Sequence, residues 1–258
     1  MNLFEIENLK RYFIVKDGFF KKAPIKAVDD ISFELKKGEI LSIVGESGCG
    51  KSTTAKLLIG IDNPTDGKIL FKQKDRTKFR GSELKEFRKS VQIIFQDPYS
   101  SLNPRWKVGK IIAEPLELNS NLNKKEIKEE VLAIMQKVGL KQEWYERYPH
   151  QFSGGQRQRI GIARALILKP EVIICDEPVS ALDVSIQAQV LNLLLDLQEE
   201  FGLTYLFISH DLGVVRHISD RILVMQLGKI VERGTTEEIF ENPQHEFTKT
   251  LIEAIPKI

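Results

Sequence analysis

Apolar residues along the chain follow two different periods. Short, continuous apolar runs rich in valine and isoleucine predict buried strands, and apolar residues three and four positions apart predict helices. Strands are expected at residues 40–44, 91–95, 172–175 and 205–208. Helices are expected at residues 53–59, 82–89, 155–169, 185–201 and 245–254. Strands that alternate with helices in this way predict an α/β fold with a parallel core.

Further β segments lie outside this alternation. Residues 4–9 and 27–35 alternate apolar and polar side chains, which predicts two antiparallel strands in a small β-layer beside the parallel core. The basic and aromatic residues between them, 16–26, are expected to form a solvated loop. Another strand is expected at 68–72, and a hairpin at 221–232 around a Leu-Gly turn.

The β signals are absent between residues 104 and 149. Asn123 can cap a helix whose apolar residues form one stripe and which Gly139 would end. This predicts an α-helical subdomain inserted between strands of the core. The expected organisation is one domain over 1–258, with a core and β-layer at 1–96 and 155–234, a helical subdomain at 97–154 and a short C-terminal helical extension at 235–258.

Composition narrows the classes of function only slightly. The 258 residues are 42% hydrophobic and 29% charged, which is ordinary for a globular protein. The net charge of +2, from 38 basic and 36 acidic residues, gives no indication of nucleic-acid binding. The sequence contains no run of 18 or more apolar residues, so no membrane span is predicted. The two cysteines, Cys49 and Cys175, are not expected to form a disulfide, which fits a reducing cytosol.

The first buried strand leads into a glycine-rich loop and then a helix, the context that a phosphate-binding loop needs. The loop fits G-x-x-x-x-G-K-[ST], and the residues expected to contact a nucleotide are Gly45, Glu46, Ser47, Gly48, Cys49, Gly50, Lys51, Ser52 and Thr53. Lys51 can reach the β- and γ-phosphates, and the Ser52 hydroxyl can ligate Mg²⁺. A glycine-rich turn matches this pattern by chance in about one chain per hundred of this length. The loop therefore predicts nucleotide binding.

Cys49 lies inside this loop, close to Lys51 and to the start of a helix. Such surroundings favour the thiolate, which predicts a thiol that reacts with alkylating reagents and is protected by ATP.

Two later stretches complete a site for nucleotide hydrolysis. The buried strand at 172–175 ends in Asp176, which can hold Mg²⁺, and in Glu177, which can activate a water molecule. The simpler interpretation is that both carboxylates cap a helix. The turn Ser153-Gly154-Gly155-Gln156 can bind an anion at a helix start, or can be an ordinary N-cap.

With the phosphate loop before it and the two carboxylates after it, this turn resembles the signature of an ATP-binding-cassette (ABC) ATPase. The resemblance implies a P-loop NTPase (RecA-like) core, ATP and Mg²⁺ as cofactors, and ATP hydrolysis. Other positions match residue by residue: Gln96 as the glutamine that touches Mg²⁺ and water, Asp183 in the D-loop 180–183, His210 as the switch histidine that contacts the γ-phosphate, and Tyr12, or adjacent Phe13, as the aromatic ring that stacks on adenine.

Three segments are similar to the oligopeptide and dipeptide (and nickel) importer ATPases, in particular to the second of their two paired subunits: 18–22, 94–104 and 242–245. This likeness implies a subunit that powers uptake of oligopeptides or dipeptides at the cytoplasmic face of the cell membrane. The implied partners are a homologous ATPase subunit, in a heterodimer or homodimer, two integral membrane pore subunits and, indirectly, an external solute-binding protein. Each ATP would lie between the phosphate loop of one subunit and residues 153–156 of the other. Nickel chelates are the alternative cargo.

Two rival functions belong to other classes. A soluble ABC ATPase that acts on DNA or ribosomes would carry coiled coils, zinc modules or a second cassette, whereas residues 97–152 contain neither a heptad run nor a cysteine. A P-loop kinase would leave the signature and the D-loop unexplained. We therefore expect no nucleic-acid partner.

Overall fold

The computed structural model describes residues 1–17, 21–97 and 99–255. The chain divides into two compact units by its internal contacts, one built from residues 1–80 and the chain from 204 onward, the other from 81–203. Each unit is described by itself. Two parts of the segments that carry the importer resemblance, residues 18–20 and 98, lie outside the described residues. The subdomain boundaries expected from the sequence stay a prediction.

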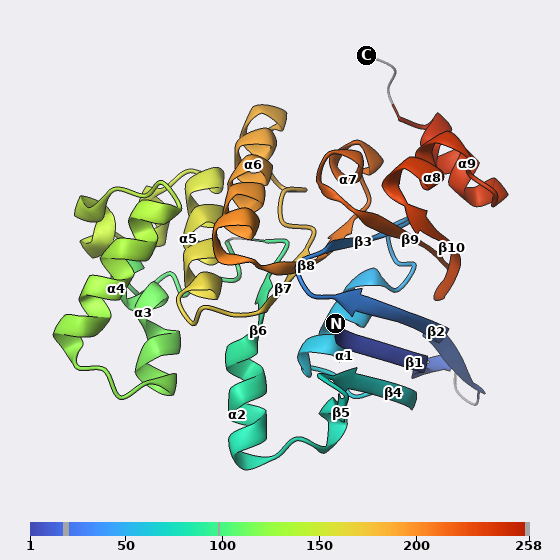
Figure 1. Ribbon diagram of the computed structural model, residues 1–258, viewed down its shortest axis with the longest axis horizontal. Coiled ribbons are helices and arrows are strands. Elements are labelled where there is room, and N and C mark those ends of the chain that lie inside the picture. The colour runs from blue at the N-terminus through green and yellow to red at the C-terminus, as the bar shows by residue number, and fades with distance from the viewer. Residues whose placement is uncertain (18–20, 98, 256–258) are drawn as a thin grey trace. The chain divides into compact units, whose positions relative to one another are not determined.

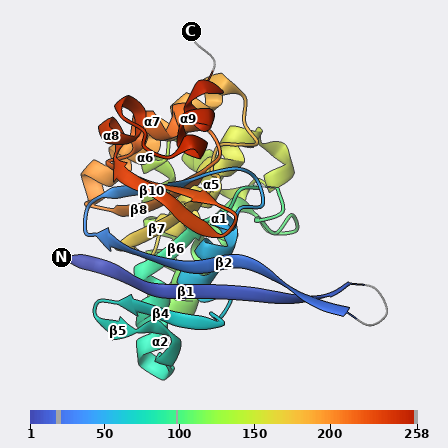
Figure 2. The same ribbon diagram turned by 90° about the vertical axis from the view of Figure 1, so that its right-hand side faces the viewer.

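The first unit contains a four-stranded antiparallel sheet in the order β2-β1-β4-β5. Its strands are β1 (Asn2–Asp17), β2 (Lys21–Lys36), β4 (Asp66–Phe71) and β5 (Lys74–Asp75). The predicted antiparallel β-layer is confirmed, but the loop expected at 16–26 is wrong over its described residues, 16–17 and 21–26, which belong to β1 and β2, and these two strands pair with each other (Figure 2). Antiparallel pairing satisfies backbone groups whatever the side chains are, so a basic, aromatic segment can still form strands.

The same unit contains the strands β3 (Ile40–Val44), β8 (Thr204–Ser209), β9 (Arg221–Gln226) and β10 (Lys229–Thr235), in the order β10-β9-β3-β8 (Figure 1). β3 runs parallel to both β8 and β9, and β9 pairs antiparallel with β10. Every side chain of β3 and β8 is buried, as expected for parallel strands covered on both faces. The predicted hairpin is confirmed, with its turn at Leu227 and Gly228.

Helices and short 3-10 turns complete the first unit: α1 (Lys51–Ile59), η1 (Arg76–Lys78), α7 (Leu212–Ile218), α8 (Thr236–Glu241) and α9 (Glu246–Glu253). α1 follows β3 after only the phosphate loop, as the sequence predicted. α8 begins at a capping box between Thr235 and Glu238, in which the threonine hydroxyl accepts a hydrogen bond from the Glu238 amide.

The second unit is mostly helical. Its elements are α2 (Gly81–Ser90), β6 (Val91–Ile94), α3 (Val108–Asn119), α4 (Lys124–Lys137), η2 (Gln142–Glu146), η3 (Pro149–Gln151), α5 (Gly154–Leu166), β7 (Val172–Asp176) and α6 (Val184–Phe201). β6 and β7 pair in parallel, and all five residues of β7 are buried. The predicted cap at Asn123 is confirmed as a capping box with Glu126. α3 contains Pro115, a residue that usually ends a helix, and no separate helix was expected there.

Candidate functional site

The phosphate loop of the first unit has a backbone path that requires glycine at two positions. Gly45 has φ 152° and Gly50 has φ 114°. A Cβ at Gly45 would lie 2.1 Å from the carbonyl oxygen of Met225, and one at Gly50 would lie 2.1 Å from that of Ala27. No side chain fits at these distances, so the two glycines let the loop pass close to the neighbouring backbone.

Lys51 lies inside the loop, with only 4% of its surface exposed. Its ammonium group donates hydrogen bonds to the carbonyl oxygens of Gly45, at 2.7 Å, and Glu46, at 2.9 Å. Ser52 and Thr53 follow on the first turn of α1 and are half-buried. A cation and a helix N-terminus therefore meet in one loop, which is the arrangement that binds phosphate groups.

The phosphate loop is held in place by backbone contacts, which no sequence pattern predicted. The backbone N–H of Gly228, in the turn between β9 and β10, donates to the carbonyl oxygen of Cys49 at 2.9 Å. The carbonyl oxygen of Gly228 in turn accepts from the N–H of Asp29 on β2, at 2.8 Å. The β9–β10 turn thus connects the phosphate loop to the β1–β2 hairpin.

Tyr12, one of the two candidates for stacking on adenine, belongs to the same connection. Its hydroxyl donates to Oδ1 of Asp29 at 2.5 Å, and this hydrogen bond raises the pKa of Tyr12 to about 12. The Asp29 carboxylate also pairs with Lys26, at 3.3 Å, and with Lys229, at 3.7 Å. The phenol ring is therefore fixed beside the strand that holds the loop.

The other candidate, Phe13, has a different environment. It is 37% exposed, and the Arg11 guanidinium lies 4.5 Å from the centre of its ring. These surroundings do not decide which of the two rings stacks on adenine, so both assignments stay predictions.

His210 also belongs to the first unit and follows β8 directly. Its side chain is exposed, between Ser209, whose hydroxyl accepts from the Asp211 N–H at 2.9 Å, and Asp211, whose carboxylate caps α7. These two hydrogen bonds fix the backbone on both sides of the histidine.

The second unit brings together two residues that lie 81 positions apart in the sequence. Nε2 of Gln96, after β6, donates to Oε2 of Glu177, after β7, at 2.9 Å. β6 and β7 are paired in parallel, so the residues that follow them lie at the same edge. Asp176 is 6% exposed at the end of β7, and Glu177 has φ 49°, a left-handed conformation that is uncommon for residues other than glycine. Such backbone strain is often found at functional sites.

The serine–glycine turn is also part of the second unit. Ser153 and Gln156 form a reciprocal capping box at the start of α5, so the ordinary N-cap weighed in the sequence analysis is present. A Cβ at Gly155 would lie 2.4 Å from Ile186, whereas one at Gly154 would lie 3.3 Å from Leu182. Gly155 is therefore required for packing, whereas a side chain at the half-buried Gly154 needs only a small shift of the Leu182 side chain.

The predicted metal ligands divide between the units. Ser52 lies in the first, and Gln96 and Asp176 lie in the second. Within the described part of the chain, no cluster of three or more histidine, cysteine, aspartate or glutamate side chains could hold a metal ion. The three predicted ligands offer hydroxyl, amide and carboxylate oxygens, the donors that Mg²⁺ prefers. Asp183, the predicted D-loop residue, is exposed just before α6.

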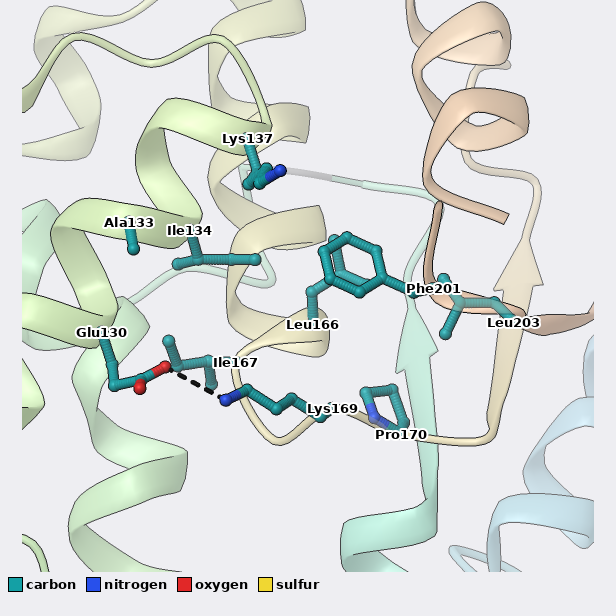
Figure 3. A pocket seen from close by; sticks show the side chains of 10 residues that line it. All are labelled: Glu130, Ala133, Ile134, Lys137, Leu166, Ile167, Lys169, Pro170, Phe201 and Leu203. Carbon is teal, nitrogen blue, oxygen red and sulfur yellow. Dashed lines mark ion pairs between the residues drawn. The ribbon is translucent and has the colours of Figure 1, made fainter. Parts of the chain in front are cut away.

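A hollow of about 240 Å³ lies in the second unit. It is bordered by α4 and by the ends of α5 and α6, and Figure 3 shows Ile134, Leu166 and Phe201 pointing into it. On its rim Lys169 pairs with Glu130 at 3.4 Å, and Lys137 pairs with Glu200. None of the predicted site residues lines it.

The close approach at Gly45 predicts the effect of a substitution. Gly45→Ala should push the loop away from Met225 and weaken ATP binding by about tenfold or more, because displaced backbone of this kind costs about 1–3 kcal/mol. Gly38→Ala is the matched control, since Gly38 also has a positive φ and nothing lies within 4 Å of the added Cβ, but it lies outside the phosphate loop. Filter binding of radiolabelled ATP to the isolated chains measures both. Equal affinities would contradict the requirement for glycine at position 45.

Both cysteines are free, and the environment of Cys49 does not favour the thiolate expected from the sequence. Cys49 is 7% exposed, and burial raises its pKa more than the Lys51 ammonium lowers it. Cys175 is fully buried on β7, and its pKa is also raised. Lys51 does lie close to the Cys49 thiol, as expected, but desolvation has the larger effect on the pKa of that thiol.

We therefore expect both thiols to react with Ellman's reagent about tenfold or more slowly in the folded chain than in the unfolded chain. The absorbance of the released thiolate, followed at constant pH with and without denaturant, measures the two rates. A Cys49→Ser variant assigns each phase to one cysteine. Rapid modification of Cys49 in the folded chain would restore the first interpretation.

Among the residues described, no helix combines the length and the apolar character needed to cross a membrane.

Comparisons with known proteins agree with this geometry. The profile of a family described as "ABC transporter" matches residues 28–180. The dipeptide transport ATP-binding protein DppF of Haemophilus influenzae is 57% identical over 252 residues, which are 97% of this chain and 77% of that protein. The oligopeptide transport ATP-binding protein OppF of Salmonella typhimurium is 55% identical over 259 residues, 98% of this chain and 78% of that protein.

Solved structures are similar over most of the chain. CbiO1 of Clostridium perfringens, part of the ABC transporter complex CbiONQ, has a TM-score of 0.80 at 28% identity and covers 99% of this chain and 96% of its own. The ATP-binding cassette MJ0796, in a dimeric post-hydrolysis state bound to ADP and Pi, has a TM-score of 0.80 at 28% identity and covers 90% of this chain and 98% of its own.

Proposed function

The chain belongs to the ABC transporter family, and from that membership we propose that it is the ATP-hydrolysing subunit of an importer for dipeptides or oligopeptides. The proposed cargo class rests on one observation. Over nearly the whole chain, the sequence is 57% identical to a dipeptide transport ATP-binding protein and 55% identical to an oligopeptide transport ATP-binding protein. The fold is that of the ABC ATPases, and the cofactor is ATP.

The phosphate loop and its lysine bind the nucleotide in this proposal. Backbone N–H groups of residues 45–52 and the N-terminus of α1 face the phosphates, and the Lys51 ammonium turns from its two carbonyl acceptors toward the β- and γ-phosphate oxygens. His210 contacts the γ-phosphate, and Tyr12 or Phe13 stacks on the adenine. The Tyr12–Asp29 hydrogen bond keeps the Tyr12 ring in one orientation, which supports Tyr12 for this role.

Glu177 is the general base of the reaction. A water oxygen attacks the γ-phosphorus while the bond to the ADP oxygen breaks, and the proton of that water passes to the Glu177 carboxylate. The Gln96 amide, which donates to Oε2, holds this carboxylate in one orientation. Ser52, Gln96 and Asp176 would hold Mg²⁺, which would neutralise the charge on the phosphate oxygens.

The assembled importer needs further subunits. The turn 153–156 completes the ATP site of a homologous ATPase subunit, in a heterodimer or in a homodimer. Two integral membrane pore subunits bind the groove formed by the helical subdomain and the loop that begins at Gln96. This contact lies at the cytoplasmic face of the cell membrane. An external solute-binding protein delivers the cargo. Nucleic acid has no part in this cycle.

The test is transport by the assembled complex. A tagged chain is purified from native membranes in detergent together with the subunits that remain bound, and the complex is reconstituted in liposomes with its external binding protein. We expect ATP-dependent accumulation of labelled dipeptides or oligopeptides, and a higher ATPase rate when peptide is present. Accumulation of a nickel chelate without peptide uptake would assign the alternative cargo, and recovery of the chain without membrane subunits would contradict the proposed function.

A further inference from the structure

Two arginines of α5 hold the loop that follows β6. The guanidinium group of Arg157 lies 3.8 Å from the centre of the Tyr99 ring, and Nη1 of Arg164 donates to the carbonyl oxygen of Ser101 at 2.6 Å. The arginines are seven positions apart, so they lie on the same face of the helix. Two described residues of the loop that begins at Gln96 (the Gln96 loop), Tyr99 and Ser101, are therefore each attached to α5.

The same Arg157 also holds the segment before the serine–glycine turn. Its Nε donates to the carbonyl oxygen of Pro149 at 2.8 Å, and η3, which contains Pro149, ends two residues before Ser153. Arg157 is 8% exposed, so its cation contacts Tyr99 and Pro149 away from bulk water. One planar group thus connects the Gln96 loop with both sides of the turn that begins α5.

Arginine suits this position better than lysine. Its flat, delocalised cation can stack on an aromatic ring while an N–H in its plane donates to a carbonyl oxygen, whereas an ammonium group offers no flat face. A cation over an aromatic ring gains more when it is desolvated, as Arg157 is. Loss of the ring would remove the stacking contact and open the guanidinium to water, which would loosen the segment that it holds.

We propose that Tyr99 and Arg157 are positioning residues that transmit a displacement of the Gln96 loop to the turn 153–156. The inference rests on the proposed function, because it takes the loop as the contact of a pore subunit and the turn as part of the partner subunit's ATP site. A pore subunit that moves the loop then moves the Tyr99 ring, the Arg157 guanidinium and the start of α5 together.

The exposure of Tyr99 makes the proposal testable without unfolding the protein. Tyr99 is 63% exposed, so its removal creates little cavity, and it has no predicted role in binding or hydrolysing ATP. Tyr99→Ala removes the ring from Arg157. Tyr99→Phe is the matched control, because phenylalanine keeps the face on which the guanidinium lies.

The first experiment measures coupling in the reconstituted complex, as the ratio of the ATPase rate with peptide-loaded binding protein to the basal rate. We expect Tyr99→Ala to lower this ratio about fivefold or more, Tyr99→Phe to retain it, and neither to change the basal rate. Arg157→Lys removes both the ring contact and the hydrogen bond to Pro149, so it should lower the ratio at least as far as Tyr99→Ala. The double variant should then be no worse than Arg157→Lys alone, because Arg157→Lys already removes the contact with the ring. An unchanged ratio for Tyr99→Ala, in a complex whose parent is stimulated, overturns the proposal. A parent complex without stimulation contradicts the proposed function instead.

The second experiment uses the isolated full chain and does not depend on a pore. Amide hydrogen exchange of residues 150–157 should be about fivefold or more faster in Tyr99→Ala than in the parent, and unchanged in Tyr99→Phe. Exchange at the same rate in all three chains overturns the link between the loop and the turn. Faster exchange over the whole second unit, accompanied by a lower melting temperature, would show a purely structural role and would overturn it as well.

Discussion

Replacing Glu177 with glutamine is expected to slow ATP hydrolysis by about 100- to 10,000-fold, the range that a general base contributes. The amide has the shape of the carboxylate but cannot take the proton of the attacking water. Its oxygen can still accept the hydrogen bond that Gln96 donates, so the geometry after β7 should be retained. ATP binding should be unchanged, and the ATP-bound dimer should accumulate.

The measurement is the ATPase rate of the assembled complex, together with ATP binding by the isolated variant. Glu171→Gln is a matched control, because Glu171 is a half-buried glutamate at the opposite end of β7, and this variant should hydrolyse ATP at the parent rate. A Glu177→Gln complex as fast as the parent would remove the role assigned to Glu177.

Replacing Gly154 with aspartate is expected to abolish hydrolysis and transport by the complex and to leave ATP binding by the isolated chain near the parent value. The variant should fold, because the added Cβ lies 3.3 Å from a single side chain, Leu182, which has to shift by a few tenths of an ångström. In the proposed dimer the new carboxylate would face the γ-phosphate bound by the partner subunit, and two negative charges at close range repel each other. The chain's own phosphate loop belongs to the other compact unit.

Gly154→Ala separates charge from bulk and should keep most of the activity. Gly155→Ala has a different expected outcome, because its Cβ would lie 2.4 Å from Ile186 and would disturb the packing of α5. Filter binding on the isolated chains and ATPase rates of the complexes distinguish these cases. Loss of ATP binding by isolated Gly154→Asp would mean that the turn serves the subunit's own site, and a fully active complex would contradict the signature assignment.

Local patterns determined most of the elements. The strands β3, β7 and β8 were predicted because a parallel strand covered on both faces must be apolar along its whole length. The cap at Asn123 was predicted because a side chain at the start of a helix can reach the free N–H groups of its first turn. The phosphate loop was recognisable because its chemistry needs glycines and a lysine at fixed spacing.

Other features depended on backbone pairing or on burial, which neighbouring residues in the sequence do not encode. The hairpin of β1 and β2 extends through the basic residues expected to form a loop, because the two strands satisfy each other's backbone groups. Cys49 has a lysine two positions away, but its pKa is decided by how completely the surrounding chain excludes water.

The sequence by itself determined the family and the phosphate loop and predicted most of the strands and helices, because each motif and each element depends on residues close together along the chain. The tertiary structure alone decided which distant groups meet: Gln96 with Glu177, Gly228 with Cys49, and Arg157 with Tyr99. A hydrogen bond or a ring contact acts over a few ångströms, and only the folded path of the backbone brings residues so far apart in the sequence within that range.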